Sequence, residues 1–231
     1  MAAENKRRGS FSEKTRTKVL LWSDRHCCIC KKSCGMNIEV HHIIPIEKEG
    51  TSDIDNAIPL CFECHAFVEH YNAKHPRGNK FKKRELKARR EQVYDEFTRH
   101  LVPPIHYRLT QNLPGGGHRE FPDVGFEIAH RGDSLPVKVC VLIENEKKGV
   151  SLGLPEAPGD YTGDKKWNLN PGFAISGHFR LPNVDGKGDL TLRLLVTVID
   201  AYEREHENLP VGYRYDPNRK LWILEPASRD K

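Results

Sequence analysis

The fold of the N-terminal part of the chain is decided by Val40-His41-His42-Ile43-Ile44-Pro45 and, after Asn56, by Leu60-Cys61-Phe62-Glu63-Cys64-His65. A further Cys-x-x-Cys pair, Cys27 and Cys30, lies just upstream. Two such pairs can supply the four thiolates of one tetrahedral Zn²⁺ site, while the adjacent and distant histidines offer a separate set of imidazoles. The stretch therefore predicts a zinc-stapled domain in which structural and chemical groups are interleaved.

The predicted structural site binds one zinc ion through both Cys-x-x-Cys pairs. Its four ligands are Cys27, Cys30, Cys61 and Cys64. A small domain rich in loops has little core, and structural Zn²⁺ contributes about 10–16 kcal/mol in zinc-finger peptides. Cys28 and Cys34 are alternative ligands if the first pair is shifted, whereas Cys140, alone in an apolar segment, is expected in the core. No secretion signal accompanies the seven cysteines, so metal binding is favoured over a disulfide framework.

The composition is that of a globular intracellular protein. Of the 231 residues, 30% are charged and 37% are hydrophobic. No apolar run approaches the roughly 18 residues that a membrane helix needs, and residues 1–14 lack the apolar core of a signal peptide. We therefore expect a cytoplasmic protein with no membrane partner.

The net charge of +5 is unevenly distributed. Residues 1–100 hold 20 Lys+Arg against 14 Asp+Glu, a net of +6, and residues 101–231 hold 17 against 18, a net of −1. Residues 74–90 contain nine basic residues and one acid, a net of +8. A solvated surface is the plainer interpretation, but the position beside the Cys/His cluster favours contact with DNA phosphates. The predicted contacts are Lys80, Lys82, Lys83, Arg84, Lys87, Arg89 and Arg90.

Helices are predicted on both sides of the Cys/His stretch. The first covers residues 12–24 with Ser12 as its N-cap, and a longer one covers residues 80–101 with its apolar residues along one side. Between them, residues 37–46 are rich in strand-forming residues and residues 64–71 are predicted to be a short helix. The N-terminal domain therefore combines strands with flanking helices.

The domain boundary is predicted at a segment rich in proline and glycine. Pro103-Pro104 ends the long helix, and no sustained periodicity follows until about residue 123. The chain is therefore divided into an N-terminal domain at 1–102, a linker at 103–122 and a second domain at 123–231.

The second domain is predicted to be mainly β. Residues 137–143 form an apolar run, residues 173–181 and 190–198 alternate apolar and polar side chains, and residues 213–224 contain a hairpin. Short strands separated by turns favour a sandwich or a small barrel, so the whole chain is assigned to the α+β class. Five aromatic residues of this domain could line a ligand pocket or belong to the core: Tyr161, Trp167, Tyr213, Tyr215 and Trp222.

The His41-His42 pair suits phosphodiester hydrolysis. In an extended segment adjacent side chains point to opposite faces, so one imidazole can bind a metal while the next acts on a nearby water. The reaction needs a cation that neutralises charge on the phosphate and a base that activates water near neutral pH. The pair therefore indicates a metal-dependent nuclease.

Residues 22–71 resemble the HNH, or ββα-metal, endonuclease family. Both Cys-x-x-Cys pairs, the His41-His42 pair, Asn56 and His65 occur in the family's order and near its usual spacings. By this resemblance, His42 is the general base that activates water, and His41 is a ligand of the catalytic divalent ion. Asn56 braces the loop between the two strands and holds the base in place. His65, at the start of the helix, is the second metal ligand.

The resemblance leaves the third ligand and the metal open. Glu69 lies one helical turn after His65, where the family sometimes adds a ligand, with His70 and water as alternatives. Two imidazoles with a carboxylate and water suit Mg²⁺, Mn²⁺, Ni²⁺ or Zn²⁺. The rival interpretation is a non-catalytic zinc module that scaffolds a nucleic-acid- or protein-binding surface, but such a scaffold would not need His42, Asn56 and His65 together.

The second domain resembles no family that its sequence identifies. It is expected to aim the nuclease, either as a reader of DNA or of a modified base, as in restriction enzymes, or as a sensor or docking surface for a licensing partner, as in phage-defence systems. Its near-neutral charge favours a partner or a ligand over bare DNA. Cutting both strands usually needs two active sites, so a homodimer is a further expectation.

Overall fold

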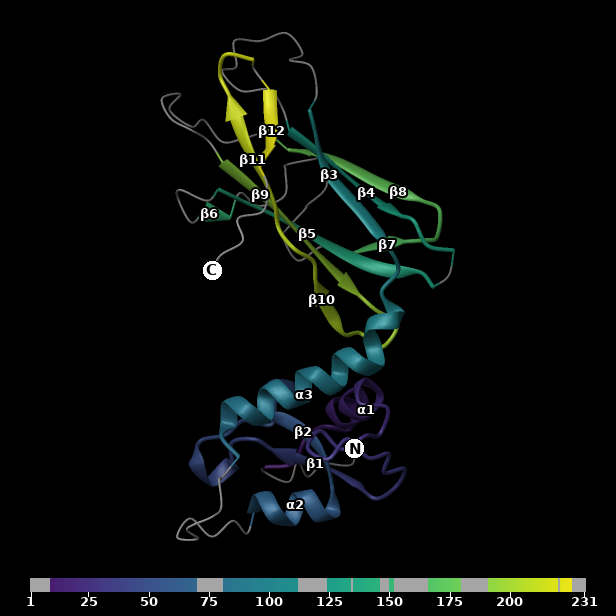
Figure 1. Cartoon of the computed structure of the whole chain (residues 1–231), viewed down its shortest axis with the longest axis vertical. Coiled ribbons are helices and arrows are strands. Elements are labelled where there is room, and N and C mark those ends of the chain that lie inside the picture. The colour runs from purple at the N-terminus through teal and green to yellow at the C-terminus, as the bar shows by residue number, and fades with distance from the viewer. Residues whose placement is uncertain are drawn as a thin grey trace, which may run out of the picture. The chain divides into compact units, whose positions relative to one another are not determined.

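The computed structural model describes residues 9–69, 81–111, 124–133, 135–145, 150–151, 166–179, 191–219 and 221–225 (Figure 1). The chain divides into two compact units, Met1–His100 and Leu101–Lys231. The α-helices of the described residues all belong to the first unit, and the second unit is built from strands. The chain therefore has the α+β class expected from its sequence.

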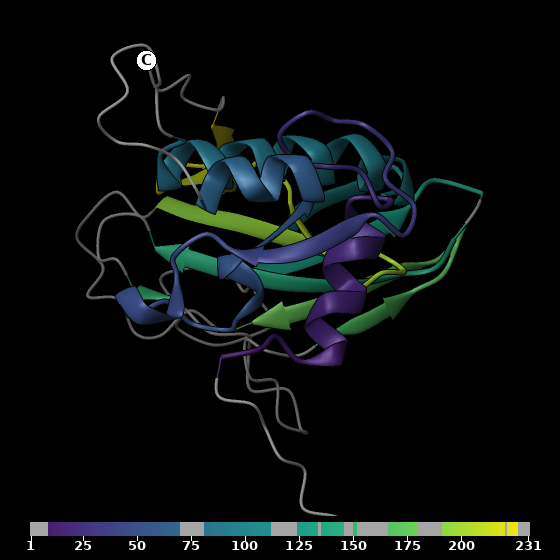
Figure 2. The same ribbon diagram turned by 90° about the horizontal axis from the view of Figure 1, so that it is seen from below.

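The first unit is built around a two-stranded antiparallel ribbon. β1 (Ile38–His42) pairs with β2 (Ala57–Cys61), and α2 (Phe62–Glu69) follows β2 without a connecting loop. α2 contacts both strands, while α1 (Glu13–Trp22) and α3 (Lys83–Thr98) contact β2 and each other. Figure 1 shows α2 on one side of the ribbon and α3 on the other, and Figure 2 shows α1 crossing the ribbon.

The helices of the first unit begin and end near the predicted positions. The Ser12 side chain accepts a backbone hydrogen bond of 3.1 Å in the first turn of α1, which confirms Ser12 as the N-cap. The apolar side of α3 enters the core through Leu86, Val93 and Tyr94. None of the helices in the described residues is long and apolar enough to cross a membrane. The short 3-10 helices are η1 (Ile46–Lys48), η2 (Ile54–Asn56) and η3 (Arg99–Leu101).

Arg90 lies on α3 but is buried, with 7% of its surface exposed. Its guanidinium donates to the backbone carbonyls of Ile54, Asp55 and Ala57 at 3.2, 2.8 and 3.2 Å. It also donates to the carboxylate of Glu91 at 2.7 Å. The prediction that Arg90 contacts DNA phosphates is therefore wrong, because its donors attach α3 to the segment that leads into β2.

The second unit contains two antiparallel sheets. The smaller sheet has the order β3 (Ile105–Gln111), β4 (Val124–His130) and β8 (Ala174–Phe179). The strands of the larger sheet are β5 (Val137–Asn145), β6 (Val150–Ser151), β7 (Trp167–Leu169), β9 (Thr191–Ile199), β10 (Glu205–Glu207), β11 (Val211–Asp216) and β12 (Leu221–Glu225). Their order is β12-β11-β9-β5-β6, with β10 beside β9 and β7 beside β5. Apolar residues of β4 share one core with those of β5 and β9, so the two sheets pack through their apolar faces.

Four aromatic residues that could have lined a ligand pocket are instead buried or packed against other side chains. Tyr213 and Tyr215 are 8% and 5% exposed. Trp222 packs against Tyr215 with ring centroids 5.3 Å apart, and Trp167 lies 6.0 Å from Phe126. The fifth, Tyr161, lies outside the described residues.

The predicted linker at 103–122 is wrong in its first half. Residues 105–111 form β3, which pairs with β4 along its whole length. The strand alternates apolar and polar residues, a pattern that the neighbouring prolines and glycines concealed. Residues 112–122 lie outside the described part of the chain.

The buried position of Arg90 predicts a large effect on stability. Arg90→Ala leaves three backbone carbonyls of the first unit without their donor, so it should lower the free energy of unfolding by about 2–3 kcal/mol. Urea unfolding followed by the helical circular dichroism signal measures this, because the described α-helices lie in the first unit. Arg84→Ala, an exposed arginine of the same helix, is the matched control and should leave stability unchanged. Equal stability of the two variants would contradict the structural role of Arg90.

Candidate metal and phosphodiester site

Four cysteines converge where β2 meets α2. Cys27 and Cys30 belong to the turn after α1, Cys61 ends β2, and Cys64 lies in the first turn of α2. Their sulfur atoms all lie within 4.8 Å of one another, and the Sγ atoms of Cys30 and Cys61 are 3.8 Å apart. Sulfur ligands about 2.3 Å from a tetrahedral zinc ion are separated by about 3.8 Å. The four thiols therefore fit a structural Zn²⁺ site.

The protonation of these thiols also suits a cation. Burial raises the pKa of the Cys27 thiol, but backbone hydrogen bonds, chiefly that of Cys30, outweigh burial, so the pKa lies below its ordinary value. Burial and the neighbouring Cys27 thiol raise the pKa of Cys30 and of Cys64. Four clustered thiolates can coexist only when a cation neutralises them, so zinc binding and deprotonation occur together.

The cysteine cluster also sets the start of α2. The Cys64 N–H donates to the Cys61 sulfur at 3.4 Å, so this sulfur caps the helix in its first turn. The N–H of Cys28 donates to the Pro59 carbonyl at 3.0 Å and so attaches the turn after α1 to β2. Because His65 follows Cys64 directly, the metal site fixes the position of this histidine.

Neither alternative cysteine belongs to the cluster. Cys28 is 1% exposed and burial raises its pKa, so it behaves as an apolar core residue. The Cys34 thiol donates to the carbonyl of Lys32 at 3.1 Å. Cys140 lies in β5 of the other unit. Among the described residues, the cysteine cluster is therefore limited to the four predicted ligands.

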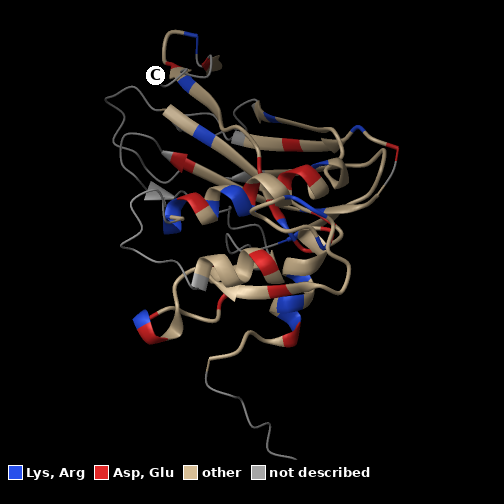
Figure 3. Cartoon of the chain, turned by 60° about the horizontal axis from the view of Figure 1, so that its bottom comes forward, with Lys and Arg blue, Asp and Glu red and all other residues tan. Residues whose placement is uncertain are grey.

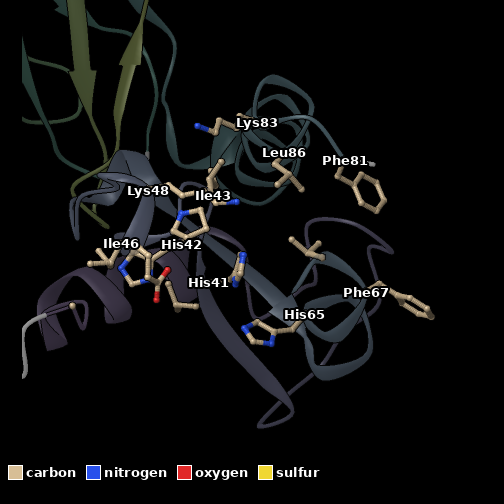
Figure 4. A pocket seen from close by; sticks show the side chains of 15 residues that line it. His41, His42, Ile43, Ile46, Lys48, His65, Phe67, Phe81, Lys83 and Leu86 are labelled. Atoms are coloured by element: carbon tan, nitrogen blue, oxygen red, sulfur yellow. The ribbon is translucent and has the colours of Figure 1, made fainter. Parts of the chain in front are cut away.

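Three histidines line one cavity of the first unit, about 600 Å³ in volume. Figure 4 shows His41 and His65 near each other and His42 on the side of the turn that follows β1. The rings of His41 and His65 lie edge to face with centroids 4.8 Å apart. Neighbouring residues of a regular strand point to opposite faces. His41 and His42 both line the cavity because His42 is the last residue of β1. The other lining residues are Gly9, Val40, Ile43, Pro45, Ile46, Glu47, Lys48, Phe67, Val68, Phe81, Lys83 and Leu86.

The His42 imidazole is contacted on its face and on its edge. The ring of Phe11 stacks on it with centroids 3.9 Å apart and an interplanar angle of 16°. The Oγ atom of Ser52 lies 3.3 Å from Nε2. Burial lowers the pKa of His42 below its ordinary value, and the carboxylate of Glu47 offsets only part of this effect. The imidazole is therefore mainly neutral at pH 7, the form that can accept a proton.

Asn56 braces the connection between β1 and β2. Its side chain, in a residue that is 5% exposed, accepts the N–H of Ile44 at 2.8 Å and donates to the carbonyls of Ile44 and Thr51 at 2.9 and 2.7 Å. Gly50 lets this connection close tightly, because a Cβ atom there would lie 1.9 Å from the Ile44 carbonyl oxygen. Asn56 therefore links the segment after His42 to the far side of the loop.

Glu39 is a residue of this region that the sequence interpretation missed. Its carboxylate lies 3.7 Å from Nε2 of His65. Glu39 precedes His41 by two positions in β1, so the two side chains share one face of the strand. The spacing of two residues between Glu39 and His41 could have indicated Glu39 from the sequence alone. Glu69, predicted as the third ligand, ends α2, but its side chain and all of His70 lie outside the described residues.

The N-terminal end of α3 borders the cavity. Lys83, Phe81 and Leu86 line it. Apart from Glu85, basic residues gather in the first half of α3 and acidic ones in the second half (Figure 3). This order is opposite to the one that the helix dipole favours, since cations are stabilised at the C-terminal end. The helix therefore presents positive charge to the cavity at some cost to its own stability.

The residues predicted to contact phosphates differ in their exposure and in the ion pairs that they already make. Lys82, Lys83, Arg84 and Lys87 are exposed. Arg89 instead pairs with Glu85 at 3.0 Å and lies over the ring of Phe81. Lys80 lies outside the described residues.

Comparison with known families identifies the segment that carries this site. Residues 27–69 match the family model described as HNH endonuclease. The match includes the four clustered cysteines, the three cavity histidines and Asn56, and it confirms the resemblance found in the sequence. A comparison with curated proteins finds no match to the chain.

The cysteine cluster predicts that zinc holds the first unit together. Cys61→Ala removes both a zinc ligand and the cap of α2, so the variant should lose bound zinc and the helical circular dichroism signal of the first unit. Metal content is measured by mass spectrometry of the purified protein. Cys34→Ala is the matched control and should keep one zinc per chain, because Cys34 lies outside the cluster. Full zinc content in Cys61→Ala would contradict the four-cysteine site.

Proposed function

We propose that the chain is a metal-dependent HNH endonuclease that hydrolyses phosphodiester bonds of DNA, with His42 as the general base. The observation that carries the proposal is the convergence of His41, His42 and His65 on one cavity bordered by Lys83. The match of residues 27–69 to the HNH endonuclease family supports nuclease chemistry and metal binding by this segment. The remaining assignments rest on the geometry of individual residues.

His42 suits the role of base because it is neutral and held in place. It would take a proton from water as the water oxygen bonds to phosphorus, while the opposite P–O bond breaks and the leaving oxygen takes a proton from solvent. A divalent cation bound by His41 and His65 would neutralise charge on the phosphate and on the leaving oxygen. Asn56 would keep the loop around His42 fixed through its contacts to Ile44 and Thr51.

Carboxylates complete the proposed metal site. Glu39, close to Nε2 of His65, would orient that imidazole, as carboxylates behind metal-bound histidines commonly do. Glu69 remains the proposed third ligand from α2, with His70 or water in its place as the alternatives. The oxygen and nitrogen ligands suit Mg²⁺, Mn²⁺, Ni²⁺ or Zn²⁺.

DNA is the proposed substrate because exposed positive charge lies beside the cavity. Lys83 lines the cavity itself, and Lys82, Arg84 and Lys87 lie close to it in the sequence of α3. Backbone N–H groups at a helix N-terminus add to the attraction for phosphate. Such contacts position the nucleic acid without reading its sequence.

The alternative, a non-catalytic zinc module, is less well supported. A scaffold needs the four cysteines, but it gives no reason for three histidines around a cavity and a neutral imidazole among them. Measurable cleavage by the purified protein separates the two functions.

We further propose that the second unit directs the nuclease to its target in a restriction or phage-defence role. Four aromatic residues that could have formed a base-reading pocket, Trp167, Tyr213, Tyr215 and Trp222, are buried or packed against other side chains, which supports a docking surface for a partner, or for a second copy of the chain, over an aromatic-lined base reader. The charge of −1 over residues 101–231, from 17 basic and 18 acidic residues, agrees with that choice.

Replacement of the proposed base is the direct test of the mechanism. His42→Ala should reduce plasmid nicking in Mg²⁺ or Mn²⁺ by about 10²- to 10⁴-fold, because no group remains to accept the proton of water. Zinc content and DNA binding should be unchanged, since His42 is not a cysteine-site ligand. His100→Ala removes an exposed histidine of the same unit and should nick at the wild-type rate. Undiminished nicking by His42→Ala would refute the assignment.

The basic end of α3 predicts salt-dependent binding. DNA affinity should fall steeply between low and physiological salt, as counterions are released from phosphates. Lys83→Gln should weaken binding and reduce the slope of log affinity against log salt by about 1, because one phosphate contact is lost. Fluorescence anisotropy with labelled DNA measures both quantities. Lys31→Gln is the control and should keep the wild-type slope, because Lys31 lies next to Cys30 and pairs with Glu96.

A further inference from the structure

Phe11 covers one face of the proposed catalytic base. Its ring stacks on His42 with centroids 3.9 Å apart, and Phe11 itself is 5% exposed. Phe11 directly precedes the N-cap Ser12 of α1, where an apolar residue usually packs on the fourth residue of the helix. Here that residue is Arg16, which offers no matching apolar partner. The ring of Phe11 is therefore available to the imidazole of His42.

Ser52 holds the edge of the same imidazole. Its Oγ atom lies 3.3 Å from Nε2. The adjacent carbonyl of Thr51 accepts the 2.7 Å hydrogen bond from Asn56, so the loop that carries Ser52 is itself anchored. With Nε2 engaged, Nδ1 is the ring nitrogen left for proton transfer.

We propose that Phe11 and Ser52 are positioning residues that hold the imidazole of His42 in the orientation needed to activate water. The inference rests on the proposed function of His42. Rotation of an imidazole about its Cβ–Cγ bond is only weakly restricted by its own torsional preference. The stack on the ring face prevents the ring from tilting, and the contact at Nε2 fixes which edge points to the cavity. A general base must lie within hydrogen-bond reach of the attacking water, so loss of either contact lowers the rate.

The test is a set of single-turnover cleavage measurements with zinc-loaded protein in saturating excess over DNA. Phe11→Leu and Ser52→Ala should each lower the cleavage rate constant by about 10- to 100-fold, with the half-saturating protein concentration changed less than about twofold. Phe11→Tyr keeps the stacking ring and should retain most of the rate. Wild-type rates in both Phe11→Leu and Ser52→Ala would overturn the proposal.

Phe97→Leu is a matched control that separates positioning from general loss of packing. The ring of Phe97 stacks on His26 in the same unit, with centroids 4.2 Å apart and an interplanar angle of 24°. This variant removes an equivalent phenylalanine–histidine stack away from the residues that line the cavity, so it should cleave at the wild-type rate. A loss as large as that of Phe11→Leu would show that packing, not orientation, is responsible.

A double-mutant comparison shows whether the two residues act through His42. In a His42→Ala background, Phe11→Leu and Ser52→Ala should cause no further loss of the residual rate, because the group that they position is gone. A further loss equal to that in the wild-type background would overturn the proposal.

A readout that needs no activity keeps this inference separate from the nuclease assignment. In NMR spectra of histidine-labelled protein, the ring protons of His42, assigned by their absence in His42→Ala, should be shifted upfield by the Phe11 ring. Phe11→Leu should remove this shift, and Phe11→Tyr should keep it. If the shift is present but the protein does not cleave DNA, the result would contradict the nuclease function and leave the stacking geometry intact. If the shift is absent, the result would contradict the positioning role.

Discussion

The junction between β2 and α2 is the constraint on which the first unit depends. A strand and a helix that follow each other without a loop need something to fix the angle between them, and four thiols at that point can do so through one cation. The sulfur of Cys61 serves twice, as a metal ligand and as the acceptor for the Cys64 N–H. His65 is the next residue along. The group that stabilises the fold is therefore one peptide bond away from a group that is proposed to bind the catalytic ion, and neither can move without the other.

The loop between β1 and β2, which positions His42, is held by hydrogen bonds and not by a metal ion. Asn56 contacts backbone on both sides of the loop, and Arg90 attaches the last residues of the same loop to α3. Hydrogen bonds to backbone are more directional than apolar contacts, so they suit a loop that must keep His42 in one place.

The sequence predicted those parts of the site that depend on local spacing. Two Cys-x-x-Cys pairs, the His41-His42 pair and the Ser12 cap are readable because each chemical relation spans a few residues or a recurrent motif. Arg90 was misassigned because its partners, Ile54 to Ala57, lie more than thirty positions away and only the fold brings them together. Phe11 was missed for the same reason, since its significance depends on its contact with His42. Glu39 was missed although its position two residues before His41 could have indicated it. β3 was missed because composition was given more weight than alternation.

The charge order along α3 has a consequence for the stability of the first unit. A helix with its acidic residues first and its basic residues last would gain from its own dipole, whereas α3 has the reverse order. Reversal of the exposed charges alone, with the buried Arg90 kept, would therefore make the helix more stable. The present order lowers the folding free energy of the helix but places its positive end beside the histidines, where the proposed binding of DNA phosphates needs it.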